Sequence, residues 1–165
     1  MFNILGVLLI ACSTMFLATE PMEIADNELT WEPQGVIVDY IHLTPKFPAF
    51  SSDTSVIEFE LINDSETTYL YGLYTTLLRQ IDESWYIVPH YQGFLFRDVA
   101  IFLPGNEKHI FEFSVQEIHG ILEEGTYALA LNLYFHSGSR EPDVCGSRII
   151  PRIVLGTFSI SNENK

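Results

Sequence analysis

The chain has few basic residues. Lys and Arg number 8 against 22 Asp and Glu, which gives a formal net charge of −14 at pH 7. A field of this sign repels phosphate groups, so nucleic acid is not an expected partner. We attribute the acidity to the solvated outer faces of strands, with an acidic patch for a cation or a basic ligand as the alternative.

Recognisable catalytic motifs are also missing. The sequence contains no Gly-x-Ser-x-Gly, no His-Glu-x-x-His, no phosphate-binding loop and no Cys-x-x-Cys. Its histidines lie apart from one another and from cysteine, at His42, His90, His109, His119 and His136. We therefore predict no catalytic residue, no metal site and no cofactor. A hydrolase with an unrecognised site is the remote alternative.

The first 18 residues are predicted to be an export leader. Residues 2–18 carry no charge and are almost all apolar, which makes a run of about 17 residues, at the lower limit for a bilayer-spanning helix. No Lys or Arg precedes the run, although export signals usually begin with one. An ordinary signal cleaved near Ala18, an uncleaved anchor and a buried cytoplasmic segment are the alternatives.

Within this leader, Leu9-Ile10-Ala11-Cys12 resembles the lipobox of bacterial lipoproteins. The resemblance implies that Cys12 is lipidated and becomes the new amino terminus. The only other cysteine is Cys145, so whether Cys12 is lipidated or removed with the leader, no internal disulfide can form. Residues 19–33 are acidic, contain two prolines, and are predicted to be a tether that docks near Trp31.

Beyond the tether, apolar residues recur with the period of two that is typical of half-buried strands. In residues 57–61 the apolar residues face inward, while Glu58 and Glu60 face outward. In residues 127–135, the pattern predicts that one face of a strand consists of Tyr127, Leu129, Leu131, Leu133 and Phe135 and points inward. The residues predicted to point the other way are Ala128, Ala130, Asn132 and Tyr134. Further strands are expected in residues 36–41, 69–81, 85–88, 109–115 and 152–160, and up to residue 103. Asp82-Glu83-Ser84 is the predicted turn between residues 69–81 and 85–88.

Turn residues separate these strands. Leu103-Pro104-Gly105 and Glu123-Glu124-Gly125 are typical tight reversals, and Asn63-Asp64-Ser65 favours a turn through side-chain bonds to the backbone. Residues 116–122 have room for one helical turn at most. About seven to eight short strands with regular turns predict an all-β antiparallel sandwich over residues 34–160, followed by a polar tail at 161–165.

With these residues placed, the chain resembles a family of bacterial immunoglobulin-like domains found in secreted proteins and lipoproteins. The resemblance covers about residues 36–135. It rests on the motifs above and on Tyr71-Gly72, on Glu83-Ser84-Trp85-Tyr86 before Val88-Pro89, and on Leu122-Glu123-Glu124-Gly125-Thr126-Tyr127. It implies an immunoglobulin-like sandwich outside the cytoplasm with no established catalytic residues. Ala128 departs from the family, which usually has a basic residue there.

These observations predict a non-enzymatic module, lipid-anchored at the cell membrane or secreted, that binds protein or cell-wall glycan. The expected contact is the long loop 136–151, which brings arginines to an acidic protein. Its candidate residues are Ser137, Arg140, Asp143 and Arg148. An immunoglobulin-like peptidase inhibitor is the alternative. Aromatic residues in 69–96 are interpreted as core, or else as a recognition surface.

Overall fold

A computed structural model of the chain describes residues 30–91, 94–95, 99–136, 144–145 and 148–161. The strands in these ranges are β1 Val36–Ile37, β2 Ile41–Pro45, β3 Ala49–Ser51, β4 Ile57–Asn63, β5 Tyr69–Ile81, β6 Ser84–Ile87, β7 Ile101–Leu103, β8 Lys108–Phe113, β9 Gly125–Phe135, β10 Val144–Cys145, β11 Arg148–Ile149 and β12 Arg152–Ser161. One short helix, α1 Val115–His119, lies between β8 and β9.

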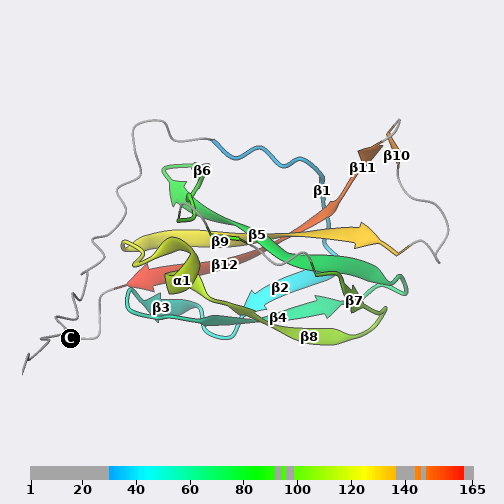
Figure 1. The fold of residues 1–165 in the computed structure, drawn as a ribbon, viewed down its shortest axis with the longest axis horizontal. Helices are drawn as coiled ribbons and strands as arrows, with labels where there is room; N and C mark the ends of the chain where they lie inside the picture. The colour runs from blue at the N-terminus through cyan, green and yellow to red at the C-terminus, as the bar shows by residue number, and fades with distance from the viewer. Residues whose placement is uncertain (1–29, 92–93, 96–98, 137–143, 146–147, 162–165) are drawn as a thin grey trace, which may run out of the picture.

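Two sheets are stacked face to face (Figure 1). The larger sheet has the order β1-β12-β9-β5-β6, with β3 added to β12 and β7 added to β5. The smaller sheet has the order β2-β4-β8, and β10 with β11 forms a separate small hairpin. The predicted all-β sandwich with an immunoglobulin-like architecture is therefore confirmed.

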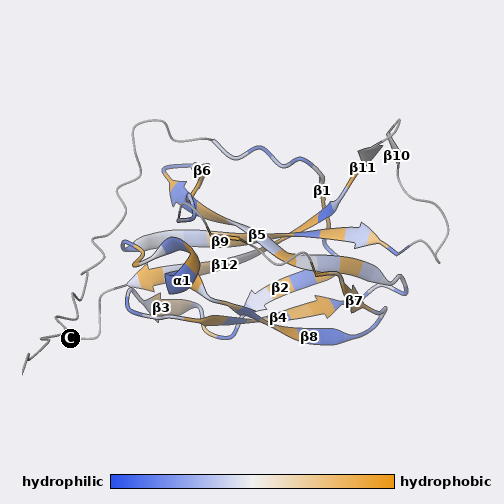
Figure 2. Cartoon of the chain, viewed as in Figure 1, coloured by the Kyte–Doolittle hydropathy of each residue, from blue (hydrophilic) through white to orange (hydrophobic). Residues whose placement is uncertain are grey.

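The core lies between the two sheets and is built from alternate residues of their strands. Ile57, Phe59 and Leu61 of β4 are all buried, as the period-two pattern predicted. From the other sheet, the core receives Tyr127, Leu129, Leu131, Leu133, Val154, Phe158 and Ile160. Figure 2 shows hydrophobic and hydrophilic residues on the same strands in both layers, as expected when each strand has one face inside.

The prediction of a single first strand over residues 36–41 is wrong. Val36 and Ile37 form β1 in the larger sheet, while Ile41 begins β2 in the smaller sheet, so the chain changes layers between them. The short strands β1 and β3 pair with β12 in parallel, whereas the other strand pairs of the described sheets are antiparallel. An alternating apolar pattern cannot show such a crossover, because the period continues on both sides of it.

The outer face of the larger sheet is partly covered. Leu78, Ala128, Ala130 and Ile153 form a second buried cluster there. The partly buried side chains that pack against this cluster are Trp31, Trp85, Ile87 and Leu155. The sequence pattern predicted a solvated face here, and that prediction is wrong at this end of the sheet.

Several local predictions hold. Asp82 has a positive φ of 53° in the turn between β5 and β6, and the final strand β12 contains the predicted residues 152–160. The helical turn predicted in 116–122 is present as α1, which is followed by Gly120 at a φ of 80°.

Among the described residues, no helix has the length and apolar character needed to cross a membrane.

Candidate functional site

Asn63 fastens one end of the sandwich. Its side chain is fully buried at the end of β4, and its Nδ2 donates to the carbonyl oxygens of Thr67 at 2.8 Å and Pro104 at 2.9 Å, with Leu103 at 3.3 Å. Its Oδ1 accepts from the backbone N–H and the hydroxyl of Ser65. Sequence predicted a local turn here, and the structure adds a bond to a segment 40 residues away.

Gly105 completes this junction. A Cβ at this position would lie 2.5 Å from the backbone carbonyl carbon of Glu66, so only glycine allows the two turns to approach. The next residue, Asn106, has a φ of 58° and donates its backbone N–H to Ser65 O at 2.9 Å. The asparagine turn and the Pro-Gly turn, which are separate motifs in the sequence, thus form one structural unit.

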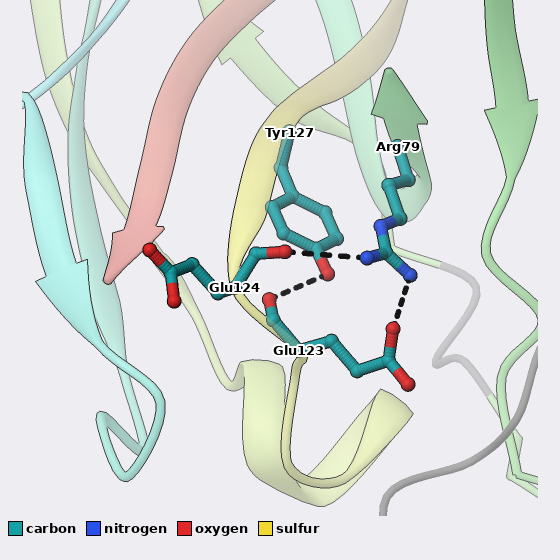
Figure 3. Close-up of polar contacts among 4 residues, drawn as sticks. All are labelled: Arg79, Glu123, Glu124 and Tyr127. Carbon is teal, nitrogen blue, oxygen red and sulfur yellow. Dashed lines mark hydrogen bonds and ion pairs between the residues drawn. The ribbon is translucent and has the colours of Figure 1, made fainter. Parts of the chain in front are cut away.

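A second polar unit joins β5 to the start of β9 (Figure 3). The Tyr127 hydroxyl donates to Glu123 O at 2.8 Å, which closes the turn before β9. Arg79 of β5 contacts the same turn twice, through the Glu123 carboxylate at 2.5 Å and through Glu124 O at 3.2 Å. A tyrosine that bonds backward to its own turn is characteristic of immunoglobulin folds.

The electrostatics of this unit indicate a structural role. Burial raises the pKa of Tyr127 to about 12, while the Arg79 guanidinium opposes the shift. The phenol therefore stays protonated and keeps its hydrogen bond at physiological pH. The Arg79 guanidinium also lies 5.9 Å from the centroid of the Tyr127 ring. The Tyr127 hydroxyl and the Arg79 guanidinium thus both bond to the turn at Glu123 and Glu124, and these bonds hold β5 and β9 together.

His119 at the end of α1 is buried and only 3% exposed. Its Nδ1 lies 2.9 Å from Pro89 O, and because a carbonyl can only accept, Nδ1 carries the proton. Its Nε2 is buried with no hydrogen-bond partner among the described residues. Burial lowers the pKa of this imidazole to about 4, which keeps it neutral.

The other described histidines do not gather around a common centre. His42 lies 3.1 Å from the Asp64 carboxylate on the surface, and His109 Nδ1 lies 3.1 Å from the Tyr71 hydroxyl. No group of three or more His, Cys, Asp or Glu side chains within the described ranges could hold a metal ion.

The structure does not place most of the predicted site residues. Cys12, Ser137, Arg140 and Asp143 lie outside the described residues. Arg148 belongs to β11, which pairs antiparallel with β10 inside the long loop. Sequence analysis missed this small hairpin because two-residue strands give no period.

The aromatic residues after residue 68 divide between core and surface. Tyr69 and Tyr71 are buried, which confirms the core interpretation for them, and burial raises the pKa of the Tyr71 hydroxyl. Tyr74 is 58% exposed, at the interruption of the β5–β9 pairing between Tyr71 and Thr75. Phe96 lies outside the described residues.

A cleft of about 390 Å³ opens on the outer face of the larger sheet. Trp31 forms one wall, and Ala130, Ile153 and Ile87 add an apolar floor. The polar side chains that line it are Thr30, Glu32, Gln34, Thr76 and Asn132. Five of the nine lining residues are polar, so the cleft combines an apolar surface with hydrogen-bonding groups that can fix the orientation of a ligand. Sequence analysis placed Trp31 at the docking point of the tether but did not predict a cleft.

A second hollow of about 380 Å³ lies beside β8. Leu73, Phe94 and Leu95 line it from one side and Phe111 and Phe113 from the other. Its polar lining groups are Glu112, Ser114 and Glu117. This hollow has aromatic side chains but no amide side chain among its lining residues, whereas the cleft at Trp31 has both.

Comparison with known proteins supports the architecture. A family model described as a bacterial Ig-like domain matches residues 40–139, more than half of the chain. The match begins just before β2 and ends after β9, so it contains the junction at Asn63 and the turn that Tyr127 closes at Glu123. No curated protein and no solved structure gave a significant match.

Proposed function

Because this chain belongs to the bacterial Ig-like domain family, we propose that it is a non-enzymatic module that binds a partner outside the cytoplasm. The partner is protein or cell-wall glycan. The observation that carries the proposal is the cleft at Trp31, which combines an aromatic wall with polar side chains. The polar groups around Asn63 and Tyr127, by contrast, already form hydrogen bonds within the fold.

The electrostatic evidence agrees with such a role. Burial favours the neutral forms of Tyr127 and His119, which raises the pKa of the phenol to about 12 and lowers the pKa of the imidazole to about 4. A general acid or base works best with a pKa near the working pH, and neither group meets that condition.

We further propose that a lipid on Cys12 holds the module at the outer face of the membrane, with secretion as the alternative. Support comes from the resemblance of residues 9–12 to a lipobox. Growing cells with a radioactive fatty acid should label the wild-type chain, and Cys12→Ser should abolish the label. An unlabelled wild-type chain would rule out this mode of anchoring.

The binding function is tested by capture. Full-length chain fixed to beads should retain material from a cell-envelope extract, analysed separately for protein and for sugar. Trp31→Ala tests the cleft, and deletion of residues 137–147 tests the long loop. Tyr134→Ala is the matched control, because Tyr134 is an exposed aromatic residue on β9 that does not line the cleft. Retention of nothing above empty beads would refute the binding function.

A further inference from the structure

We infer that the cleft at Trp31 binds one neutral sugar ring of a glycan. This inference rests on the proposed binding function and adds the chemical class of its ligand. A pyranose has one face made largely of C–H groups and an edge made of hydroxyls. A protein therefore recognises it with a flat aromatic side chain for the face and with amides, hydroxyls and carboxylates for the edge.

The aromatic wall is held in place by the backbone. Trp31 N–H donates to Trp85 O at 2.8 Å, and Thr30 forms an antiparallel bridge with Tyr86. The chain before β1 thus adds to the edge of β6, and Figure 1 shows it running across the outer side of the larger sheet. Trp31 also packs against the second buried cluster, which fixes its side chain before any ligand arrives.

Beside its apolar floor, the cleft presents polar side chains from β5 and β9 that the fold does not use. Asn132 of β9 and Thr76 of β5 both line the cleft and are half-buried. Within the described ranges, neither side chain makes a hydrogen bond. An amide supplies both donors and an acceptor, and a hydroxyl supplies one of each, which suits neighbouring hydroxyls on a sugar. Half-buried polar groups without protein partners gain from a ligand that pairs with them.

The rim adds further polar groups and sets the charge. Glu32 and Gln34 line the cleft from the same segment as Trp31, and the Gln34 amide lies 3.4 Å from Glu32 O. A carboxylate accepts strongly from hydroxyl groups but repels acidic sugars and phosphates. The net charge of −14 acts in the same direction, so the ligand is a neutral saccharide.

The size of the cleft agrees with this ligand. Its volume of about 390 Å³ is near the lower end of the range for small-molecule sites. A single sugar ring fits a cleft of this size, whereas a standard protein partner covers a much larger flat area.

The two tryptophans of the chain allow a direct test. Trp31 and Trp85 are the only ones, so Trp85→Phe leaves Trp31 as the sole indole fluorophore. The backbone carbonyl that holds Trp31 is kept in this variant. Titration of the full-length W85F chain with chitotetraose and with maltotetraose should change its fluorescence in a saturable way with at least one of them. Tetragalacturonic acid, an anionic saccharide of similar length, should have no effect.

Calorimetric titration of the wild type and of further variants locates the binding. Asn132→Ala and Thr76→Val remove polar groups while keeping the aromatic wall, and each should weaken binding about tenfold. Trp31→Ala should abolish measurable binding, and Tyr134→Ala should bind as wild type. Thermal unfolding of each variant verifies that it is folded.

Three outcomes would overturn the inference. These are no response to either neutral saccharide, a response equal to wild type in N132A and T76V, and binding of the acidic saccharide alone. Capture from the envelope extract separates this failure from failure of the proposed function. If the wild type captures material from the extract but binds neither saccharide, the sugar ligand is refuted and the proposed binding function stands. If the wild type shows neither capture nor saccharide binding, both proposals are refuted.

Discussion

At the scale of single residues, His119 makes the stability of the protein depend on pH. Its pKa is lowered from 6.5 to about 4 in the folded chain, chiefly by burial, with a smaller contribution from His90. In the unfolded chain the imidazole takes up a proton near pH 6.5. In the folded chain burial opposes this protonation until the pH is near 4. The contribution of neutral His119 to the free energy of unfolding is therefore fully present above pH 6.5. It is lost as the pH falls toward 4.

We expect the free energy of unfolding to fall by roughly 3 kcal/mol across this interval because of His119. Urea titrations at half-unit steps from pH 7 to pH 4 measure it. His119→Asn is the matched control, since its amide can still donate to Pro89 O but does not titrate. The variant should be less stable at pH 7 and should have a flatter profile between pH 6.5 and 5. Identical slopes in the two proteins would contradict the assignment.

Asn63 carries a second prediction at this scale. Its amide donates toward three carbonyl oxygens, from Thr67, Leu103 and Pro104, in a buried position. Asn63→Ala leaves these acceptors without their donor and should cost about 3 kcal/mol of unfolding free energy, measured by urea titration.

Asn63→Asp distinguishes hydrogen bonding from mere packing. The carboxylate has nearly the shape of the amide but cannot donate, and it would face carbonyl oxygens. We expect it to be at least as destabilising as alanine at pH 7. Ser65→Ala removes the hydroxyl bond to Asn63 Oδ1 and the bond that this hydroxyl accepts from Thr67 N–H, and should cost about 1 to 2 kcal/mol. A nearly neutral N63D would refute the role given to the amide donor.

At the scale of elements, Gly156 allows β12 to approach the opposite layer. A Cβ at this position would lie 2.7 Å from Leu43 O, 2.9 Å from Leu43 Cγ and 2.9 Å from a ring carbon of Phe59. The first of these atoms belongs to the backbone of β2 and cannot rotate away. The small residue is thus required by the distance between the sheets.

Gly156→Ala should therefore destabilise the protein by about 1 to 3 kcal/mol, and Gly156→Val by more, in urea titrations. Gly72→Ala is the comparison, because the nearest atom to its added Cβ is Val99 O at 3.2 Å. Its cost should be smaller. Equal costs at the two positions would show that backbone freedom, and not the approach of the layers, explains the glycine at 156.

The elements also show what sequence reasoning can and cannot reach. The burial of Phe59 and Leu129 and the turn at Asp82 follow from rules that act within a few residues, and all were predicted. The split between β1 and β2 and the bond from Asn63 to Leu103 depend on which strands become neighbours in space. A period of two carries no information about the sheet to which a strand belongs.

Sequence patterns could not predict the candidate site for the same reason. Trp31, Thr76 and Asn132 come from three distant parts of the sequence and meet only because the chain before β1 lies on β6. In sequence, Trp31 was a docking residue and Asn132 one of several outward positions. Local patterns predicted the scaffold, whereas the site follows from its assembly.

At the scale of the whole molecule, the 22 acidic residues far outnumber the 8 Lys and Arg residues that could form ion pairs with them. The described ion pairs with lysine and arginine are Lys46–Glu58, Lys108–Glu60 and Arg79–Glu123. Glu58 also lies directly across from Glu112 in the β4–β8 pairing. Like charges in opposite positions on neighbouring strands destabilise a sheet, and the net charge of −14 adds repulsion over the whole surface.

Added salt should therefore stabilise this protein, because screening weakens repulsion among 22 acidic residues more than it weakens a few exposed ion pairs. We expect the melting temperature at pH 7 to rise by roughly 3 °C or more when sodium chloride increases from about 10 mM to about 300 mM.

Glu112→Gln, which removes the charge opposite Glu58, should melt at a higher temperature than wild type at low salt and gain less from added salt. Glu117→Gln on α1 has no such partner in the pairing of β4 with β8 and serves as the control for the loss of one charge. A fall in melting temperature with added salt would contradict this prediction. It would mean that attraction in the ion pairs contributes more to stability than repulsion among the acidic side chains subtracts.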